Sequence, residues 1–212
     1  MHLNSRLLFE RYAAPYFADA SRVLEIGPDR VPSTYWELAG RRPSEWHTAD
    51  LQAALETGGS DRWAGAPSAF TYAMESEYQL PVEDGAYDIV LSGQVMEHVR
   101  LIWRWMPELT RVCRAGGHVI TISPVSWPYH EVPLDCWRVY PEGMRALSEE
   151  AGLEVVLSRC ESLEPEPSRN SYPGLSYAEV PPGGRLREAM KRRLGWPLPV
   201  ALDTITIARK PG

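Results

Sequence analysis

An acidic side chain two residues before a glycine marks the first candidate site of the chain. Glu25-Ile26-Gly27-Pro28-Asp29 follows a short apolar run that begins at Arg22, which is typical of a buried strand entering a sharp turn. Glycine in such a turn lets backbone N–H groups approach a ligand closely. A dinucleotide-binding turn would carry three glycines, whereas this segment carries one. The carboxylate of Glu25 instead suits a cationic amino group.

A stretch rich in aromatic and ionisable side chains, Ser123–Tyr140, is the second candidate site. His130 titrates near neutral pH and suits proton transfer, and His98 and Asp135 are further candidates for this catalytic role. Asp135 and Arg138 also suit the hydroxyl or carboxylate groups of a small polar acceptor. Aromatic side chains suited to enclose a ring are Trp127, Tyr129, Trp137 and Tyr140. The alternative is a structural loop held by a salt bridge between Asp135 and Arg138.

Alternating strands and helices must hold these residues in place. Apolar or β-branched runs predict strands at 22–26, 45–50, 69–74, 87–92, 118–122, 153–157 and 202–208. Helical patterns occupy 6–20 with a break near Pro15, 33–39, 96–113 and 141–151, and Ala115-Gly116-Gly117 is expected to end the third. This alternation favours a parallel sheet with helices on both faces. Ligands of such sheets bind at the carboxyl ends of the strands.

The turn at Glu25 resembles a known cofactor motif. Val23-Leu24-Glu25-Ile26-Gly27-Pro28 is similar to the first motif of the class I S-adenosylmethionine (SAM)-dependent methyltransferases, which is written acid-x-Gly-x-Gly. Gly27 matches the first glycine, and Asp29 stands where the second normally is. This departure leaves open whether Asp29 weakens SAM binding.

Three later segments resemble the same family in the same order. Met74–Pro81 with Gly85–Val90 resembles an acidic turn and a Leu-Pro pair leading into FDxV. Ser92–Val99 resembles xxxxEHV, and Leu109–Gly117 resembles ExxRVLKPGG. The resemblance implies an α/β fold, a Rossmann-like doubly wound sheet of about seven strands, mostly parallel with the last strand antiparallel.

The resemblance also implies which residues bind SAM. In the family the glycine turn wraps the methionine part, an acid ending the second strand holds the ribose hydroxyls, and an acidic turn meets the adenine. The segment after the fourth strand lines the pocket. The corresponding residues are Glu25, Gly27, Pro28, Asp50, Met74, Glu75, Ser92 and Gln94. At the adenine position the alignment places Ser76 at the usual acid, between Glu75 and Glu77, and Glu75 is the favoured of these. A Glu-His pair such as Glu97-His98 positions a helix and the cofactor pocket in the family, which is the alternative to a catalytic His98.

The expected reaction is transfer of the SAM methyl group to a small molecule. Ser123–Tyr140 resembles the P…H..P.D.WR.T segment of methyltransferases encoded near saccharide and natural-product pathways. A hydroxyl of a sugar or secondary metabolite is therefore the favoured acceptor. N-methylation of a small molecule is one alternative. Another is a methyltransferase-fold protein that binds SAM without transferring a methyl group.

Composition limits the other partners. The 212 residues carry a formal charge of −6, which repels a phosphate backbone, so nucleic acid is not expected as a partner. No run reaches the apolar length of a membrane helix, and three widely spaced cysteines indicate neither a disulfide framework nor a metal site. We expect one cytoplasmic domain over residues 1–212, without membrane contact, with additions at about 124–140 and 161–199. A homodimer is compatible with the sequence.

Overall fold

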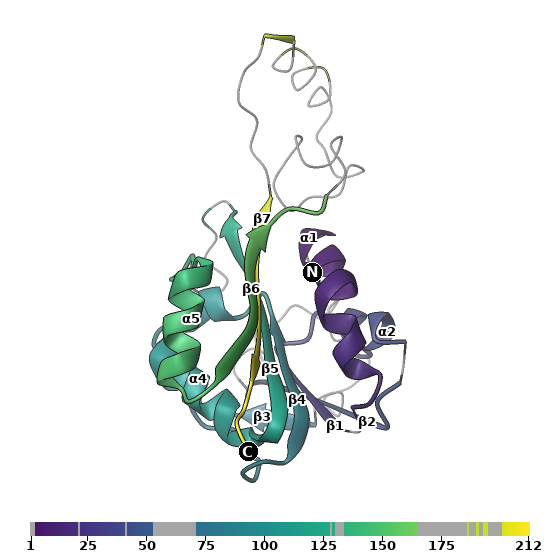
Figure 1. The fold of residues 1–212 in the computed structure, drawn as a ribbon, viewed down its shortest axis with the longest axis vertical. Helices are drawn as coiled ribbons and strands as arrows, with labels where there is room; N and C mark the ends of the chain where they lie inside the picture. The colour runs from purple at the N-terminus through teal and green to yellow at the C-terminus, as the bar shows by residue number, and fades with distance from the viewer. Residues whose placement is uncertain are drawn as a thin grey trace.

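The computed structural model describes residues 3–20, 22–40, 42–52, 71–127, 129, 134–164, 186, 190, 193–194 and 201–212 (Figure 1). Within these residues, seven strands form one sheet in the order β3-β2-β1-β4-β5-β7-β6. The strands are β1 (Arg22–Ile26), β2 (Glu45–Leu51), β3 (Tyr72–Met74), β4 (Tyr87–Gly93), β5 (Cys113–Ser126), β6 (Glu154–Glu161) and β7 (Leu202–Arg209). Most of the predicted addition at 161–199, and residues 128 and 130–133 of the predicted addition at 124–140, lie outside the described residues.

Strand direction follows the predicted pattern. β1 pairs in parallel with β2 and β4, β2 pairs in parallel with β3, and β4 pairs in parallel with β5. β7 runs antiparallel to both β5 and β6. The predicted fold class, a mostly parallel Rossmann-like sheet with an antiparallel last strand, is confirmed. We call the end of the sheet where β1 to β5 finish and β7 begins the carboxyl edge.

Helices cover both faces of the sheet (Figure 1). α1 (Leu3–Leu8) and α2 (Thr34–Leu38) lie on one face, and α4 (Ile102–Val112) and α5 (Pro141–Glu150) lie on the other. α1 continues as a π-helical turn and then as a 3-10 turn that contains Pro15 and ends at Phe17, close to the predicted break. Ser33 begins α2 as predicted, because its hydroxyl accepts the N–H of Trp36 at 3.1 Å.

Alternation along the strands separates two apolar layers. Leu24 and Val90 pack with the residues of α4 and α5, whereas Val23 and Leu91 pack with those of α1 and α2. Successive side chains of a strand point to opposite faces. Glu25 therefore lies on the face covered by α1 and α2.

The helix predicted at 96–113 is broken in the structure. A 3-10 turn at Met96–His98 is followed by extended backbone at Val99, and α4 begins only at Ile102. Side chains from elsewhere satisfy the backbone groups freed by the break. The indole N–H of Trp137 donates to the carbonyls of Val99 at 2.8 Å and Arg100 at 3.2 Å. The prediction of one continuous helix was wrong because these tertiary bonds replace helical ones.

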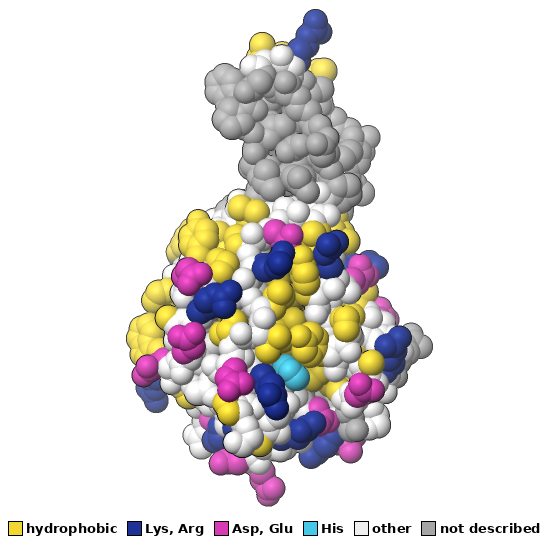
Figure 2. All heavy atoms as spheres, in the orientation of Figure 1, with side chains coloured by type: hydrophobic (Ala, Val, Ile, Leu, Met, Phe, Trp, Pro, Cys, Tyr) yellow, Lys and Arg dark blue, Asp and Glu magenta, His cyan; other side chains and the backbone are white. Residues whose placement is uncertain are grey.

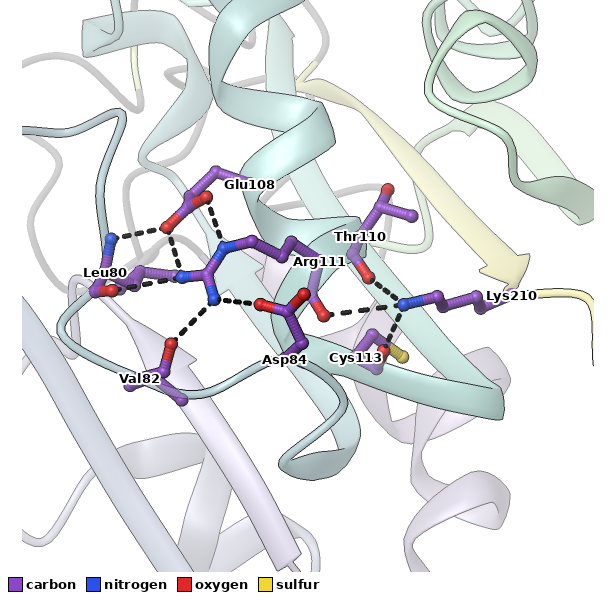
Figure 3. Close-up of polar contacts among 8 residues, drawn as sticks. All are labelled: Leu80, Val82, Asp84, Glu108, Thr110, Arg111, Cys113 and Lys210. Carbon is purple, nitrogen blue, oxygen red and sulfur yellow. Dashed lines mark hydrogen bonds and ion pairs between the residues drawn. The ribbon is translucent and has the colours of Figure 1, made fainter.

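The carboxyl end of α4 differs from the prediction as well. The helix ends at Val112 and β5 starts at Cys113, ahead of the glycines that were expected to end it. Lys210 Nζ donates to the carbonyls of Thr110 at 2.9 Å and Cys113 at 2.8 Å (Figure 3). A lysine from the C-terminus thus satisfies the last helical carbonyls, a role that the sequence pattern assigned to Gly116 and Gly117.

Arg111 joins α4 to the loop before β4. Its guanidinium forms two bonds to the carboxylate of Glu108, at 2.8 and 2.7 Å, and donates to the carbonyls of Leu80 at 3.1 Å and Val82 at 2.7 Å (Figure 3). Glu108 in turn accepts the N–H of Leu80 at 2.6 Å. This planar network fixes the segment that follows β3.

Substitution of Arg111 tests this network. We expect Arg111→Lys to lower the free energy of unfolding by about 1–3 kcal/mol, because an ammonium cannot reproduce the forked bonds and leaves buried carbonyls without a donor. Urea denaturation measures the change. Arg6→Lys is the matched control, since Arg6 and Glu10 form an exposed pair for which we expect at most ~0.5 kcal/mol. Equal effects of the two substitutions would contradict this role of Arg111.

Charges of both signs are mixed on the visible surface. On the face shown in Figure 2, lysine and arginine side chains lie among aspartates and glutamates rather than in one basic patch. Among the helices of the described residues, none has the length and apolar character needed to cross a membrane.

Candidate functional site at the carboxyl edge

The turn after β1 holds a buried acid beside a left-handed glycine. Glu25 is 1% exposed and accepts a bond from the indole N–H of Trp46 at 2.8 Å. Gly27 has φ +63° and donates its N–H to the carbonyl of Ala49 at 2.9 Å, which ties the turn to the end of β2. A Cβ on Gly27 would lie 2.5 Å from Cγ2 of Val95. Both the backbone conformation and the close approach therefore require glycine here.

Asp29 has a structural role in the same turn. Its carboxylate accepts the N–H of Thr34 at 3.0 Å and the Thr34 hydroxyl at 2.7 Å, at the start of α2. Its backbone does not have a positive φ. The turn thus does not need a second glycine at this position, and the carboxylate faces the helix start that it stabilises.

The ends of β2 and β3 bring three more predicted residues to the same edge. Asp50 is half-buried near the end of β2, directly across from Ala73 of β3. Met74 is 4% exposed and belongs to the apolar core, while Glu75, the next residue, is exposed. Because β1, β2 and β3 are neighbours, Gly27, Asp50 and Glu75 follow one another along the carboxyl edge.

The end of β4 carries a residue in an unusual conformation. Among the described non-glycine residues, only Gln94 has a left-handed backbone, with φ +60°. Its backbone N–H donates to Ile122 of β5 at 2.8 Å, and its side-chain amide donates to Ser5 of α1 at 2.7 Å and to Asp203 of β7 at 3.0 Å. Ser92, which precedes it, is 2% exposed. Three separate elements thus hold Gln94 in place.

The described part of the second candidate segment is fastened to the turn after β4. The ring Nδ1 of His98 bonds to the carbonyl of Leu134, and the N–H of Cys136 donates to the carbonyl of Glu97 at 2.7 Å. Arg138 and Asp135 form a two-pronged ion pair, with one bond of 2.7 Å. The salt bridge considered as the structural alternative is therefore present, and one nitrogen of His98 is occupied by the backbone.

The remaining predicted residues of this segment divide into two groups. Trp137 and Arg138 are partly buried and bonded to backbone carbonyls. Tyr129 and Tyr140 are 71% and 62% exposed. His130 lies outside the described residues, so its role as the base stays a prediction.

Comparison with known proteins supports the predicted family. Residues 35–121 match a family model described as a methyltransferase domain. Over 117 residues, or 55% of this chain, the sequence is 35% identical to an uncharacterized methyltransferase of Mycobacterium avium and 34% identical to one of Mycolicibacterium paratuberculosis. The match covers 36% of each of those proteins, so the chain spans about a third of the length of these curated relatives.

Solved structures show the same fold. A SAM-dependent methyltransferase from Archaeoglobus fulgidus superposes with a TM-score of 0.61 at 19% identity, over 97% of this chain and 92% of that chain. Phosphoethanolamine N-methyltransferase 2 of Haemonchus contortus, solved with SAM, gives 0.57 at 16% identity over 99% of this chain and 53% of that one. The matched domain and the shared fold support the predicted family, the class I SAM-dependent methyltransferases, and SAM as its cofactor.

The carboxyl edge of this sheet fits a cationic and polar cofactor. Burial raises the pKa of Glu25 to about 8, although bonds from Ser33 and Trp46 lower it. A buried carboxylate at such a pKa gains most from a positive partner, and the amino group of SAM supplies one. Within the described residues, buried polar atoms that lack a hydrogen-bond partner include the hydroxyls of Tyr35, Ser92 and Ser123. Such groups are rarely left unpaired in a folded protein, so their position at this edge suits a polar ligand.

Two depressions on the described surface lie away from the carboxyl edge. A depression of about 470 Å³ is lined by Tyr16, Arg114 and His118 among others, at the opposite edge of the sheet. At the carboxyl edge, α1, Tyr35 and Val95 lie over the ends of the strands. The candidate site at the carboxyl edge therefore rests on the position of the polar groups and not on the size of a hollow.

The buried acids make stability depend on pH. Burial also raises the pKa of Glu97 to about 8, although Arg138 lowers it. A carboxyl group whose folded pKa lies above its unfolded value of about 4.3 favours the fold at low pH and loses this contribution as pH rises towards 8. We expect Glu97→Gln to reduce the fall in Tm between pH 5 and pH 8 by at least ~2 °C, measured by calorimetry. The exposed Glu10→Gln is the control, and parallel curves for wild type and Glu97→Gln would contradict this assignment.

Two buried polar residues of this edge were missed by the sequence analysis. Asp203 is 2% exposed at the start of β7, and Asn4 of α1 is fully buried against it. An acid inside the β-branched run Leu202–Ala208 was a usable signal for Asp203. Asn4 lies ahead of the predicted helix, and its contact spans 199 positions, so no local pattern indicates it.

Proposed function

We propose that this chain transfers the methyl group of SAM to a hydroxyl of a small molecule, such as a sugar or secondary metabolite. The observation that carries the proposal is the buried carboxylate of Glu25 beside the left-handed Gly27, at the carboxyl edge of a methyltransferase fold. Trp127, which directly follows β5, supports a ring-containing acceptor. The identity of that acceptor is the finer part of the proposal.

Bound SAM supplies a methyl group already activated by its positive sulfonium. The residues of the chain have three tasks: to bind the cofactor, to orient the acceptor in line, and to receive the hydroxyl proton. Glu25 and the turn at Gly27 hold the cofactor's amino acid part, and Asp50 its ribose. The Asp135–Arg138 pair and the His98–Leu134 bond fix the segment that faces the acceptor. Because these contacts exist before the acceptor binds, the acceptor hydroxyl is held close to the methyl group of SAM.

Release of S-adenosylhomocysteine tests the proposal. The purified protein is incubated with SAM and panels of sugars, hydroxylated ring compounds and amines. We expect product with a hydroxylated acceptor. Product only with amines would support the N-methyltransferase alternative. SAM binding without product from any acceptor would support a protein that uses the fold without methyl transfer; one structural neighbour, with a TM-score of 0.54, is the cyclase SpnF.

A further inference from the structure

A buried carboxylate, that of Asp203, lies at the carboxyl edge where β7 begins. Asp203 stands opposite Pro124 at the end of β5, and Gln94 links it to the end of β4. Its Oδ1 accepts from the Gln94 amide at 3.0 Å and its Oδ2 from the Asn4 amide at 2.6 Å. The structure places no ion pair on Asp203 within the described residues. A carboxylate buried with two neutral donors is costly for a protein to keep, and such groups concentrate at functional sites.

Gln94 connects this acid to the cofactor turn. It holds a left-handed backbone, which costs a non-glycine residue free energy and is found where function requires it. The next residue, Val95, contacts Gly27 of the cofactor turn. The amide oxygen of Gln94 is buried without a partner among the described residues. Gln94 thus lies between the cofactor turn and Asp203. Its side-chain oxygen can accept a hydrogen bond from a ligand.

Tyr35 provides a second unpaired group at the same place. Its hydroxyl is 2.2 Å from the position of a Cβ built on Gly93, and it has no partner among the described residues. The residue is 3% exposed. Burial raises the pKa of Tyr35 well above its usual value, and the charges of Glu25 and Asp203 contribute to the rise. A buried hydroxyl without a partner among the described residues is suited to a polar ligand at this place.

We propose that Asp203 binds the acceptor hydroxyl and takes its proton during methyl transfer, with Gln94 as the residue that positions it. This inference rests on the proposed function. The hydroxyl proton passes to the Asp203 carboxylate, the oxygen forms a bond to the methyl carbon, and the methyl–sulfur bond breaks with its electron pair on sulfur. Each carboxylate oxygen has a second lone pair free for this bond.

The surroundings favour a proton acceptor that works at neutral pH. Burial raises the pKa of Asp203 to about 6, although bonds from Asn4 and Gln94 lower it. The titratable groups that face Asp203 come from three elements: Tyr35 from α2, Glu97 from the turn after β4, and Cys160 and Glu161 from β6. The helix α1 contributes the neutral side chains of Asn4 and Ser5. Tyr12, from the turn that continues α1, donates its hydroxyl to Glu161. Asp135, by contrast, is neutralised by Arg138. A base with a pKa near 6 is ionised at pH 7 and still accepts a proton effectively.

The competing explanation is that Asp203 only anchors α1. A set of three variants separates the two roles. Asp203→Asn removes the carboxylate, Asn4→Ala removes the α1 contact, and the double variant Asn4→Asp/Asp203→Asn keeps a hydrogen bond between the two positions while moving the carboxylate to α1. Release of S-adenosylhomocysteine is measured from pH 5 to 9 with an acceptor of the wild type, and Tm and SAM affinity are measured for each.

We expect Asp203→Asn and the double variant to lower kcat by ~10²–10⁴-fold and to lose the rise in activity near pH 6, while both still bind SAM. Asn4→Ala should lower kcat less than ~10-fold, and the double variant should recover the Tm lost in Asp203→Asn. Recovery of activity in the double variant, or equal losses of kcat in Asn4→Ala and Asp203→Asn, overturns the assignment. A wild type that methylates no hydroxyl acceptor overturns the proposed function, and this inference with it.

Discussion

Gly27→Ala is expected to weaken SAM binding by at least ~100-fold. A side chain at φ +63° costs about 1–2 kcal/mol, and the added carbon meets Cγ2 of Val95 at 2.5 Å. Val95 cannot move without displacing Gln94, which is bonded to three other elements. Isothermal titration with SAM measures the loss.

Gly152→Ala is the matched control for this effect. Gly152 follows α5 and has φ +80°, and a Cβ added to it would meet no atom within 4 Å. We expect the same backbone strain, a loss of about 1–2 kcal/mol in the free energy of unfolding, with unchanged SAM affinity. If both alanine variants bind SAM as the wild type does, the turn at Gly27 is not the cofactor site.

Glu25→Gln should weaken SAM binding by ~10–100-fold without unfolding the protein. The amide keeps the shape of the side chain and accepts the Trp46 indole N–H, but it cannot pair with the positive amino group, a charge-assisted bond worth about 1.5–3 kcal/mol. Because the pKa of Glu25 is about 8, the free protein holds a proton there at pH 7, and binding of a cation must expel it.

Proton release gives this prediction a second measurement. Titrations of SAM at pH 7 in buffers of different ionisation enthalpy should report release of a fraction of a proton in the wild type and less in Glu25→Gln. Glu45→Gln serves as the control, since Glu45 pairs with Arg22 at the other end of β2 and is exposed. A wild type and a Glu25→Gln variant with equal SAM affinity would show that Glu25 is buried for structure alone.

Local sequence patterns predicted the elements on either side of the turn at Gly27. The strand at 22–26 and the helix start at Ser33 were both confirmed, because their signals, a β-branched apolar run and a capping hydroxyl, act over a few residues. The sequence also showed that Asp29 departs from the family pattern. The bond of Asp29 to Thr34 at the start of α2 could not be predicted, because it depends on how the chain turns back after Gly27.

Contacts between distant segments could not be predicted in the same way. The break at Val99 is held by Trp137, 38 positions later, and the end of α4 by Lys210, about 100 positions later. The contact between Gln94 and Asp203 could not be predicted from local patterns either. Gln94 and Asp203 meet across 109 positions because β7 inserts between β5 and β6, and this pairing is a property of the whole sheet.

We expect the carboxyl edge of this sheet to bind SAM through the turn at Gly27. Isothermal titration of the wild type with SAM at pH 7, with Gly27→Ala and Gly152→Ala in parallel, tests this binding most directly. We predict one binding site in the wild type and in Gly152→Ala, lost in Gly27→Ala. No binding by the folded wild type at millimolar SAM would contradict it.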